Sequence, residues 1–349
     1  MDDFASGDEW RNESTRERHA RWEREYGTAE PGEFNSSRPI DGDRTDKLFP
    51  TIAALLDMDL SPPDFMVDGL VPMGGIIMLG SKPDVGKSTL LRTLTVSRSR
   101  GMPWLGRSVK QGSVLLCQFE EIPTFARDHL VLMGATRDMP IFPFFEPCLG
   151  DFMERLTDWA HQHREALIII DTLGKVAPGK DLLDYNIATQ VLTPFVTLAR
   201  TTGAGIVLSH HNKKGESYDP ADDLLGSTAI RANMDHTLAI TQSGETRIIQ
   251  TVSKRYGESM PSTYLDLDPY TGRVEAGDTV KEKKGQDMEA EIMAVLQDGP
   301  LTAVELEGRI TGKSERIRRT RDAMVERGDI CRERVGRAHK YCLSVPSHS

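Results

Sequence analysis

Leu79-Gly80-Ser81-Lys82-Pro83-Asp84-Val85-Gly86-Lys87-Ser88-Thr89 is the stretch that decides the fold. The apolar run 75–78 precedes it and the run 90–94 follows it, so the pattern predicts a strand, a loop and a helix. Backbone N–H groups of such a loop and of the first helical turn surround a phosphate, and Gly86 leaves room for its approach. Lys87 would then reach the β- and γ-phosphates, and the Ser88 hydroxyl would coordinate Mg²⁺. The stretch predicts a Walker A loop that binds ATP with Mg²⁺; a glycine-containing turn with a chance Gly-Lys-Ser is the alternative.

The loop departs from strict Walker A spacing at its first position. Counting back from Gly86 places Ser81, and not Gly80, where the first glycine is expected, and a serine is still small enough there. The residues predicted to bind the nucleotide are Ser81, Lys82, Pro83, Asp84, Val85, Gly86, Lys87, Ser88 and Thr89.

Length, charge and cysteine spacing set the class of protein. The 349 residues suit one large α/β domain and a smaller module, and the net charge of -10 means that any contact with nucleic acid must come from local basic patches. No apolar run approaches the roughly 18 residues of a membrane span. Because the 4 cysteines lie far apart without a C-x-x-C pair, the sequence argues against a zinc site and a disulfide scaffold. We therefore expect a soluble, cytoplasmic protein that does not bind membranes.

The first 48 residues differ from the rest of the chain. They carry thirteen acidic and eight basic side chains and few apolar ones. Such a segment buries too little apolar surface to order itself, which predicts a charged, disordered tail at 1–48 before a globular domain at 49–278. A partner-binding segment within the tail is the alternative.

Three later strands each end on polar side chains. The run 113–119 ends on Glu120 and Glu121, the run 166–170 on Asp171, and the run 206–209 on His210 and its neighbour. Strands that alternate with helices predict a parallel sheet covered on both faces, with a ligand site at the carboxyl ends of the strands. Asp171 has the position of a Walker B carboxylate that holds Mg²⁺ through water, although a buried strand capped by Asp gives the same pattern. His210 is well placed to sense a phosphate, whereas a lone histidine is usually structural.

Taken together, these phrases resemble RecA-fold NTPases of the RepA/DnaB helicase type, and most of all the plasmid RepA-like branch. The resemblance covers roughly residues 61–268. The phrases that carry it are the Walker A loop, Val114–Glu121, Ile168–Asp171, Ser209–Lys214 and Leu225–Ala229. It implies a RecA-like α/β fold with a parallel sheet and flanking helices, and a homo-oligomer in the form of a hexameric ring.

The resemblance also implies roles for residues beyond the Walker motifs. Glu120 matches the glutamate that polarises the attacking water, with Glu121 as the neighbour that is easily confused with it. His210 matches the residue that reads the γ-phosphate. Lys254 and Arg255 match basic residues that enter the adjacent subunit's site, although solvated charges at a strand end are the plain alternative. RepA-like proteins often have Arg-Gly-Ser-Ser where this chain has Leu-Gly-Ser-Thr at 225–228, and the missing basic group gives Arg255 more weight.

The C-terminal pattern predicts a second domain. A charged linker is expected at 279–286, followed by three helices in which Thr302 and Glu305 form a capping box, and by two β-like pieces at 330–334 and 339–343. Three helices and a hairpin predict a winged helix at 287–345. Eleven basic and five acidic residues lie between Arg309 and Lys340, so this domain offers a candidate DNA face, with protein docking as the alternative.

The sequence thus predicts an ATP-hydrolysing DNA motor, a ring helicase of plasmid or phage replication. Single-stranded DNA would contact the loops 172–181 and 212–223, and duplex DNA would contact the winged helix. The candidate DNA-binding residues are Lys213, Lys214, Arg316, Arg318, Arg319 and Arg337. The alternative is an ATP-switched DNA-binding regulator or loader that does not translocate.

Overall fold

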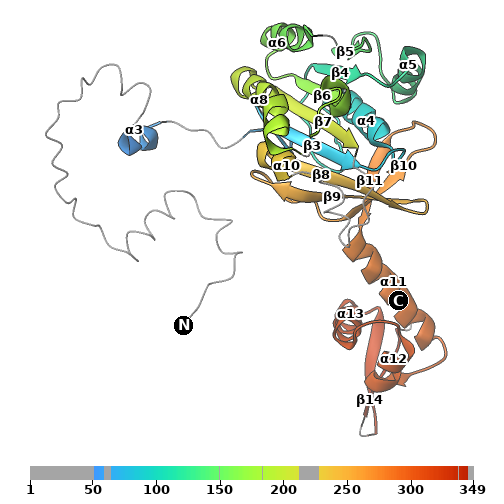
Figure 1. Ribbon diagram of the computed structural model, residues 1–349. Helices are drawn as coiled ribbons and strands as arrows, with labels where there is room; N and C mark the ends of the chain where they lie inside the picture. The colour runs from blue at the N-terminus through green and yellow to red at the C-terminus, as the bar shows by residue number, and fades with distance from the viewer. Residues whose placement is uncertain are drawn as a thin grey trace, which may run out of the picture. The chain divides into compact units, whose positions relative to one another are not determined.

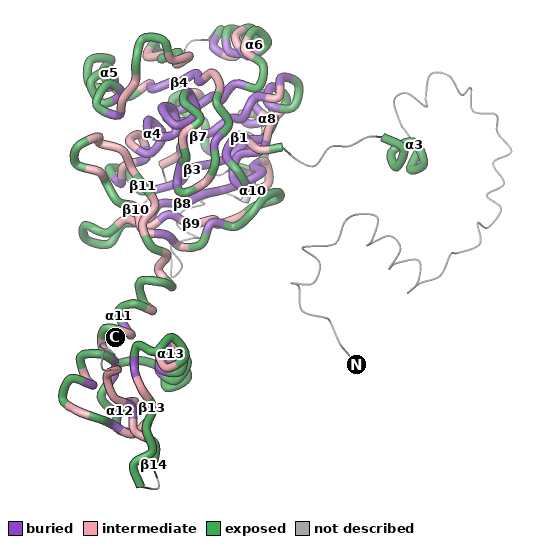
Figure 2. Tube along the Cα trace, turned by 180° about the vertical axis from the view of Figure 1, so that it is seen from behind, coloured by how far each residue is buried: buried purple, intermediate pink, exposed green. Residues whose placement is uncertain are grey.

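The computed structural model describes residues 51–58, 64–148, 150–182, 184–211, 228–336 and 338–344. The predicted tail at 1–48, the loop lysines Lys213 and Lys214, and Arg337 lie outside these ranges. Contacts divide the chain into two units, 1–61 and 62–349. In the first unit, α3 (Ile52–Leu56) begins after Thr51, whose hydroxyl accepts a hydrogen bond from the Ala54 N–H, and all of its residues are exposed (Figure 2).

A nine-stranded sheet forms the centre of the second unit (Figure 1). Its order is β11-β10-β9-β8-β3-β7-β6-β4-β5. The strands from β8 to β5 run parallel, whereas β9, β10 and β11 are antiparallel additions at one edge. The strands are β3 (Ile76–Ser81), β4 (Val114–Gln118), β5 (Ile141–Phe144), β6 (Leu167–Asp171), β7 (Gly205–His211), β8 (His236–Ser243), β9 (Thr246–Lys254), β10 (Thr263–Leu267) and β11 (Val274–Thr279). The predicted α/β class with a RecA-like parallel sheet is confirmed.

Helices cover both faces of the sheet, and each face has its own apolar core. One core joins β3, β6 and β7 to α4 (Lys87–Arg100), to α5 (Pro123–Leu132) and to the small hairpin β1 (Phe65–Val67) and β2 (Val71–Pro72). The other core joins the same strands to α6 (Phe152–Gln162), α7 (Leu173–Val176), α8 (Tyr185–Thr202) and α10 (Thr228–Asn233). Strands β3, β4 and β6 are therefore buried on both sides, as their continuous apolar runs require (Figure 2).

The segment 279–286, expected to be a linker, is helical. Helix α11 (Val280–Leu296) begins directly after β11, and Thr279 and Glu282 form a capping box at its start. Because this cap satisfies backbone N–H groups of the first turn, the helix begins earlier than the apolar spacing alone suggested. Gly285 lies inside the helix and does not end it.

The remaining C-terminal elements form a small unit of helices and sheet. They are β12 (Leu301–Thr302), α12 (Ala303–Arg309), α13 (Ser314–Arg327), β13 (Ile330–Val335) and β14 (Ala338–Leu343). The three strands pair in the order β12-β14-β13, and Ile292, Leu306 and Ile317 are at the centre of the apolar core. The predicted capping box of Thr302 and Glu305 is present at the start of α12.

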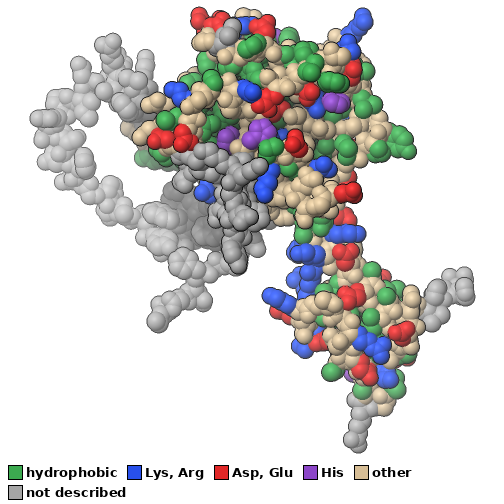
Figure 3. Space-filling model, turned by 45° about the vertical axis from the view of Figure 1, so that its right-hand side comes forward, with side chains coloured by type: hydrophobic (Ala, Val, Ile, Leu, Met, Phe, Trp, Pro, Cys, Tyr) green, Lys and Arg blue, Asp and Glu red, His purple; other side chains and the backbone are tan. Residues whose placement is uncertain are grey.

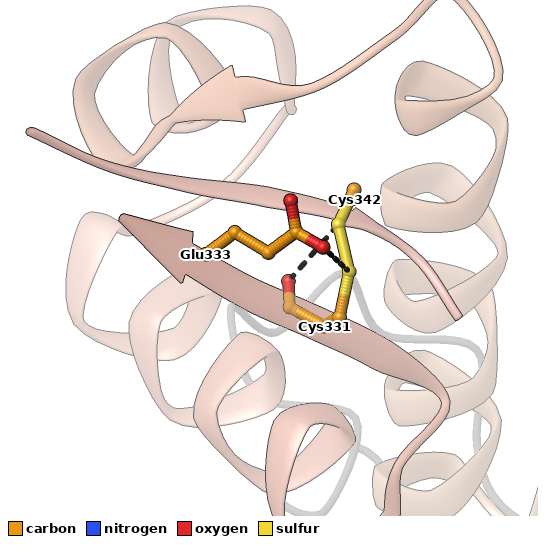
Figure 4. A group of neighbouring side chains, drawn as sticks. All are labelled: Cys331, Glu333 and Cys342. Carbon is orange, nitrogen blue, oxygen red and sulfur yellow. Dashed lines mark hydrogen bonds between the residues drawn. A yellow bond between two sulfur atoms is a disulfide. The ribbon is translucent and has the colours of Figure 1, made fainter. Parts of the chain in front are cut away.

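The cysteine spacing gave a wrong expectation in this unit. Cys331 and Cys342 form a disulfide across the hairpin of β13 and β14, with their Cα atoms 5.2 Å apart (Figure 4). The two residues are direct partners in the strand register, so they meet although ten residues separate them. Glu333 lies beside them, but their sulfur atoms are bonded to each other and do not form a pair of thiolate ligands.

None of the helices within the described ranges combines the length and the apolar character that crossing a bilayer requires.

Candidate functional site

The polar side chains at the carboxyl ends of the parallel strands lie close together, on the face of the sheet that α4 covers. Alternate residues of each strand belong to the two cores, so the positions that follow Leu116, Ile169 and Val207 by two residues share the α4 face. These positions are occupied by Gln118, Asp171 and Ser209, which are all buried. Gln118 and Asp171 are register partners, and the Ser209 hydroxyl donates to Asp171 Oδ1 at 2.6 Å. Parallel strands thus place a buried carboxylate next to the start of α4.

The phosphate loop leaves β3 after Ser81 and enters α4 at Lys87. Gly86 caps the helix with a φ of 98°, a left-handed conformation that glycine adopts without steric cost. Asp84 also has a positive φ, of 61°, in the small left-handed region that Asp and Asn tolerate better than other side chains. The loop and helix have the form that the Walker A interpretation predicted.

Lys87 is buried in this loop, with 4% of the residue exposed. Its ammonium donates to Ser81 Oγ at 2.7 Å, to the Ser81 and Lys82 carbonyls at 3.3 and 3.1 Å, and lies 3.1 Å from His211 Nδ1. Burial lowers the pKa of Lys87 to about 8, and the negative charges of Asp171, Glu120 and Asp84 oppose that shift. The ammonium therefore donates hydrogen bonds to oxygens of the loop itself, at the place where phosphate oxygens of a nucleotide would attract it.

The two glutamates after β4 have different surroundings. Glu120 is half exposed, and its carboxylate lies 3.4 Å from Lys175 Nζ and 3.7 Å from His211 Nε2. Glu121 instead forms a 2.8 Å ion pair with the buried guanidinium of Arg92 on α4. Glu120 thus faces the Lys87 cluster, while Glu121 holds α4 against the end of β4. Lys175, which belongs to the loop 172–181 expected to contact single-stranded DNA, contacts Glu120.

The contact between a histidine and Lys87 is made by His211, whereas the sequence interpretation selected His210. Along β7, Val207, Ser209 and His211 share the α4 face, and His210 points to the opposite face. Burial lowers the pKa of His210 to about 4, with smaller contributions from the nearby His211 and Lys87, so His210 is neutral near pH 7. The alternation of side chains along β7 is the sequence signal that places His211, and not His210, on the face where Lys87 lies.

Arg247 on β9 is a contact of the phosphate loop that the sequence did not suggest. Its Nε donates to the Val85 carbonyl at 3.0 Å and supports the tip of the loop. Strand β9 is far from the loop in sequence, and only the sheet order brings the two together.

Lys254 and Arg255 lie at the opposite end of the sheet from the phosphate loop. Lys254 pairs with His236, and His236 pairs with Ile77 at the start of β3. The loop leaves β3 after Ser81, about 13 Å further along the strand at ~3.3 Å per residue. Both basic residues are exposed, and Arg255 donates to the Ala232 carbonyl. Neither is brought to the phosphate loop of its own chain.

The candidate DNA residues of α13 differ in how free they are. Arg318 forms a 2.8 Å ion pair with Glu307, while Arg319 is exposed and has no ion-pair partner among the described residues. Arg316 is half-buried. Arg321 belongs to the core of the unit, because its guanidinium stacks over Tyr341 at 4.5 Å.

The donor set at the strand ends fits a magnesium ion. Asp171 offers a buried carboxylate of which one oxygen accepts from Ser209, and Ser88 places a hydroxyl in the first turn of α4. Oxygen ligands of this kind are the ones that Mg²⁺ prefers. Figure 3 shows histidine side chains that lie beside carboxylate and basic side chains on the face turned to the viewer.

A phosphate loop between the central parallel strand and its helix, with a buried acid two strands away, defines a P-loop NTPase with the RecA fold. The chain belongs to the AAA domain family, whose model matches residues 43–217 and so includes the loop, Glu120, Asp171 and both histidines.

Two solved structures that are similar to this chain were also found. One is described as an ATPase domain; it is 12% identical, with a TM-score of 0.48, and the match covers 59% of this chain and 86% of that one. The other is a DnaB-like replicative helicase, described with its interactions with primase; it is 12% identical with a TM-score of 0.49, and the match covers 68% of this chain and 67% of that one. No curated protein matches the chain.

Proposed function

We propose that the protein hydrolyses ATP and uses the energy to move on single-stranded DNA, as a hexameric ring helicase of the RepA/DnaB type in plasmid or phage replication. The observation that supports this proposal is the distance within one chain between two groups of candidate catalytic residues. Lys87, Glu120 and Asp171 stand at one end of the sheet, and Arg255 stands exposed at the other end. In the proposed ring, a second copy of the chain brings its Arg255 to the phosphate loop of its neighbour.

The proposed chemistry assigns a separate task to each side chain. Lys87 exchanges its contacts with Ser81 and Lys82 for the β- and γ-phosphates. Glu120 accepts the proton of the attacking water, as general base. Mg²⁺, held through Ser88 and Asp171, would neutralise charge on the phosphates.

His211 connects the two principal groups of this site. Its Nδ1 lies 3.1 Å from Lys87 Nζ, and its Nε2 lies 3.7 Å from the Glu120 carboxylate. A phosphate that draws Lys87 away therefore changes the surroundings of the base through a single imidazole. We assign the γ-phosphate sensor to His211 for this reason, in place of His210.

Arg255 and Lys254 are proposed to act on the neighbouring subunit. Residues of this kind stabilise the charge that develops on the transferred phosphoryl group. Because the site is then completed only between subunits, hydrolysis depends on assembly.

Particle size and unwinding test the proposal together. Light scattering with and without ATP should show a ring of six chains, and a forked duplex should be unwound only when ATP is present. A monomer that hydrolyses ATP at the full rate would contradict the proposed function.

The basic face of α13 favours a second candidate, an ATP-switched DNA-binding regulator or loader. We propose that 49–278 is the ATPase domain and that 287–345 is a winged helix, since the helices and the β12-β14-β13 sheet have the order of that fold. Exposed Arg319 on α13 suits a duplex phosphate backbone. Binding of duplex DNA that responds to ATP, without unwinding, would favour this candidate over the motor.

A further inference from the structure

Gln118, the last residue of β4, has a buried amide without a hydrogen-bond partner. The residue is 1% exposed, and within the described residues neither its Nε2 nor its Oε1 has a partner. Buried side-chain amides are nearly always paired, because an unpaired one retains the full cost of leaving water. Among the described residues, the chain thus offers no partner for either the donor or the acceptor of this amide.

The register places this amide at the nucleotide site. Gln118 is the direct partner of Asp171 on the neighbouring strand, and both side chains lie on the α4 face. Helix α4 turns Arg92 toward the end of β4, where it pairs with Glu121. Ser88 lies four residues before Arg92 and therefore on the same side of the helix. Gln118 thus lies beside Asp171 at the end of the sheet where α4 presents Ser88 and Arg92.

A hydrophobic residue would suit this position in the absence of a ligand. The preceding α4-face residues of β4 and β6, Leu116 and Ile169, are apolar and belong to one core. Keeping an amide in this row costs stability, and proteins usually retain such a group where it serves a site. An amide also offers both an acceptor and a donor, which is what water in a metal's outer shell requires.

We propose that Gln118 is a positioning residue of the metal site, whose amide hydrogen-bonds to the water through which Asp171 holds the divalent cation. The inference rests on the proposed ATP function and assigns Gln118 a part in binding the metal, without contact to the reacting atoms. Outer-shell partners of this kind typically change metal affinity by about 10-fold to 100-fold when they are lost.

The test measures binding of a fluorescent, non-hydrolysable ATP analogue by the full chain, in EDTA and in excess Mg²⁺. The dissociation constant in EDTA divided by the dissociation constant in Mg²⁺ reports how strongly the metal and the nucleotide stabilise each other's binding. Gln118→Met, which keeps the size and removes the polar atoms, should lower this ratio by about 10-fold or more and leave the affinity in EDTA unchanged. Its nucleotide-free form should unfold at a higher temperature than the unmodified protein, because the unpaired amide is gone.

Two further variants make the result specific. Gln118→Asn keeps the amide and withdraws it by one methylene group, so it should lower the ratio too, and it decides the test if the methionine variant does not fold. Thr237→Val is the matched control. Thr237 on β8 is fully buried, and its hydroxyl has no hydrogen-bond partner among the residues that the structure describes, but its register partner is Met78, in the middle of β3. It should raise the unfolding temperature and leave the ratio unchanged.

Each contrary outcome has a distinct meaning. An unchanged ratio in both Gln118 variants would overturn the assignment, and so would a loss of affinity that is as large in EDTA as in Mg²⁺. The assignment would also fail if the unmodified chain bound the analogue equally well with and without Mg²⁺. Failure of the unmodified chain to bind the analogue under any condition would instead overturn the proposed function.

Discussion

Lys87 carries a charge that the nucleotide-free fold disfavours. Burial lowers its pKa to about 8, and phosphate oxygens would stabilise the charged form and raise the pKa again. Nucleotide binding should therefore be accompanied by uptake of a proton near and above that pH.

The predicted uptake at Lys87 has a definite sign and size. A group with a pKa of about 8 is charged at pH 7 and about half neutral at pH 8, so uptake should rise from roughly a tenth of a proton to about half, and further at pH 9. Calorimetry in buffers with different ionisation enthalpies measures it. In Lys87→Arg, whose guanidinium stays charged, any remaining binding should show no such rise. Uptake that falls as the pH rises would refute the assignment.

The two glutamates after β4 should fail in different ways. Glu120→Gln should keep ATP bound and lose roughly 10²–10⁴ in turnover, because an amide cannot accept the proton of water. Glu121→Gln should keep most of its turnover and lose roughly 2 kcal/mol of stability, because the buried Arg92 loses its charged partner. Single-turnover hydrolysis and chemical denaturation separate the two effects. Normal hydrolysis by Glu120→Gln would show that the base lies elsewhere.

At the scale of residues, the sequence predicted the position of a side chain well where that position depends on local spacing. The Walker loop and Asp171 are recognisable because a strand end and a helix start flank them directly. The choice between His210 and His211 needed the direction of each side chain along β7, which alternation provides once the strand is anchored to a core. The contact of Arg247 with Val85 could not be predicted from the sequence, because it depends on the order of the strands in the sheet.

Among the elements, α13 gives a comparison of two neighbouring arginines. Arg319→Ala should reduce the slope of log affinity against log salt by about 0.9 if the exposed guanidinium neutralises one phosphate of duplex DNA. Arg318→Ala should change it less, since Glu307 already pairs with Arg318. Fluorescence anisotropy over a range of salt concentrations measures both slopes. If both variants had the same slope as the unmodified protein, the C-terminal unit would be assigned to protein docking and not to DNA binding.

The elements that the sequence missed are those that depend on distant partners. Strand β5 contains Pro143, which speaks against a strand, yet β5 is the edge of the sheet, where a missing N–H can face away from the ladder. Strands β10 and β11 were not expected, because β11 includes Glu275, Gly277 and Asp278 and is defined by its pairing with β10. By contrast, the cap of Thr302 and Glu305 was predictable because it lies within four residues.

For the whole molecule, mixing two inactive variants tests whether the site is shared. Arg255→Ala alone should lose about 10³–10⁵ in turnover and keep ATP binding, because Arg255 is proposed to stabilise only the charge that develops on the phosphoryl group during its transfer. Lys87→Ala should be inactive for lack of phosphate binding. Mixed rings should regain activity, since some interfaces pair an intact Lys87 with an intact Arg255. Rates equal to the weighted sum of the two parents would refute a shared site.

The position of Arg255, a strand's length away from the phosphate loop of its own chain, also bears on how much of the protein a cell needs. If Arg255 acts on the neighbouring subunit as proposed, a single chain holds parts of two different centres and no complete one. Dilution would then stop turnover: below the concentration at which copies assemble, each molecule would still bind ATP without hydrolysing it. The concentration of the chain would then set the threshold at which ATP hydrolysis begins.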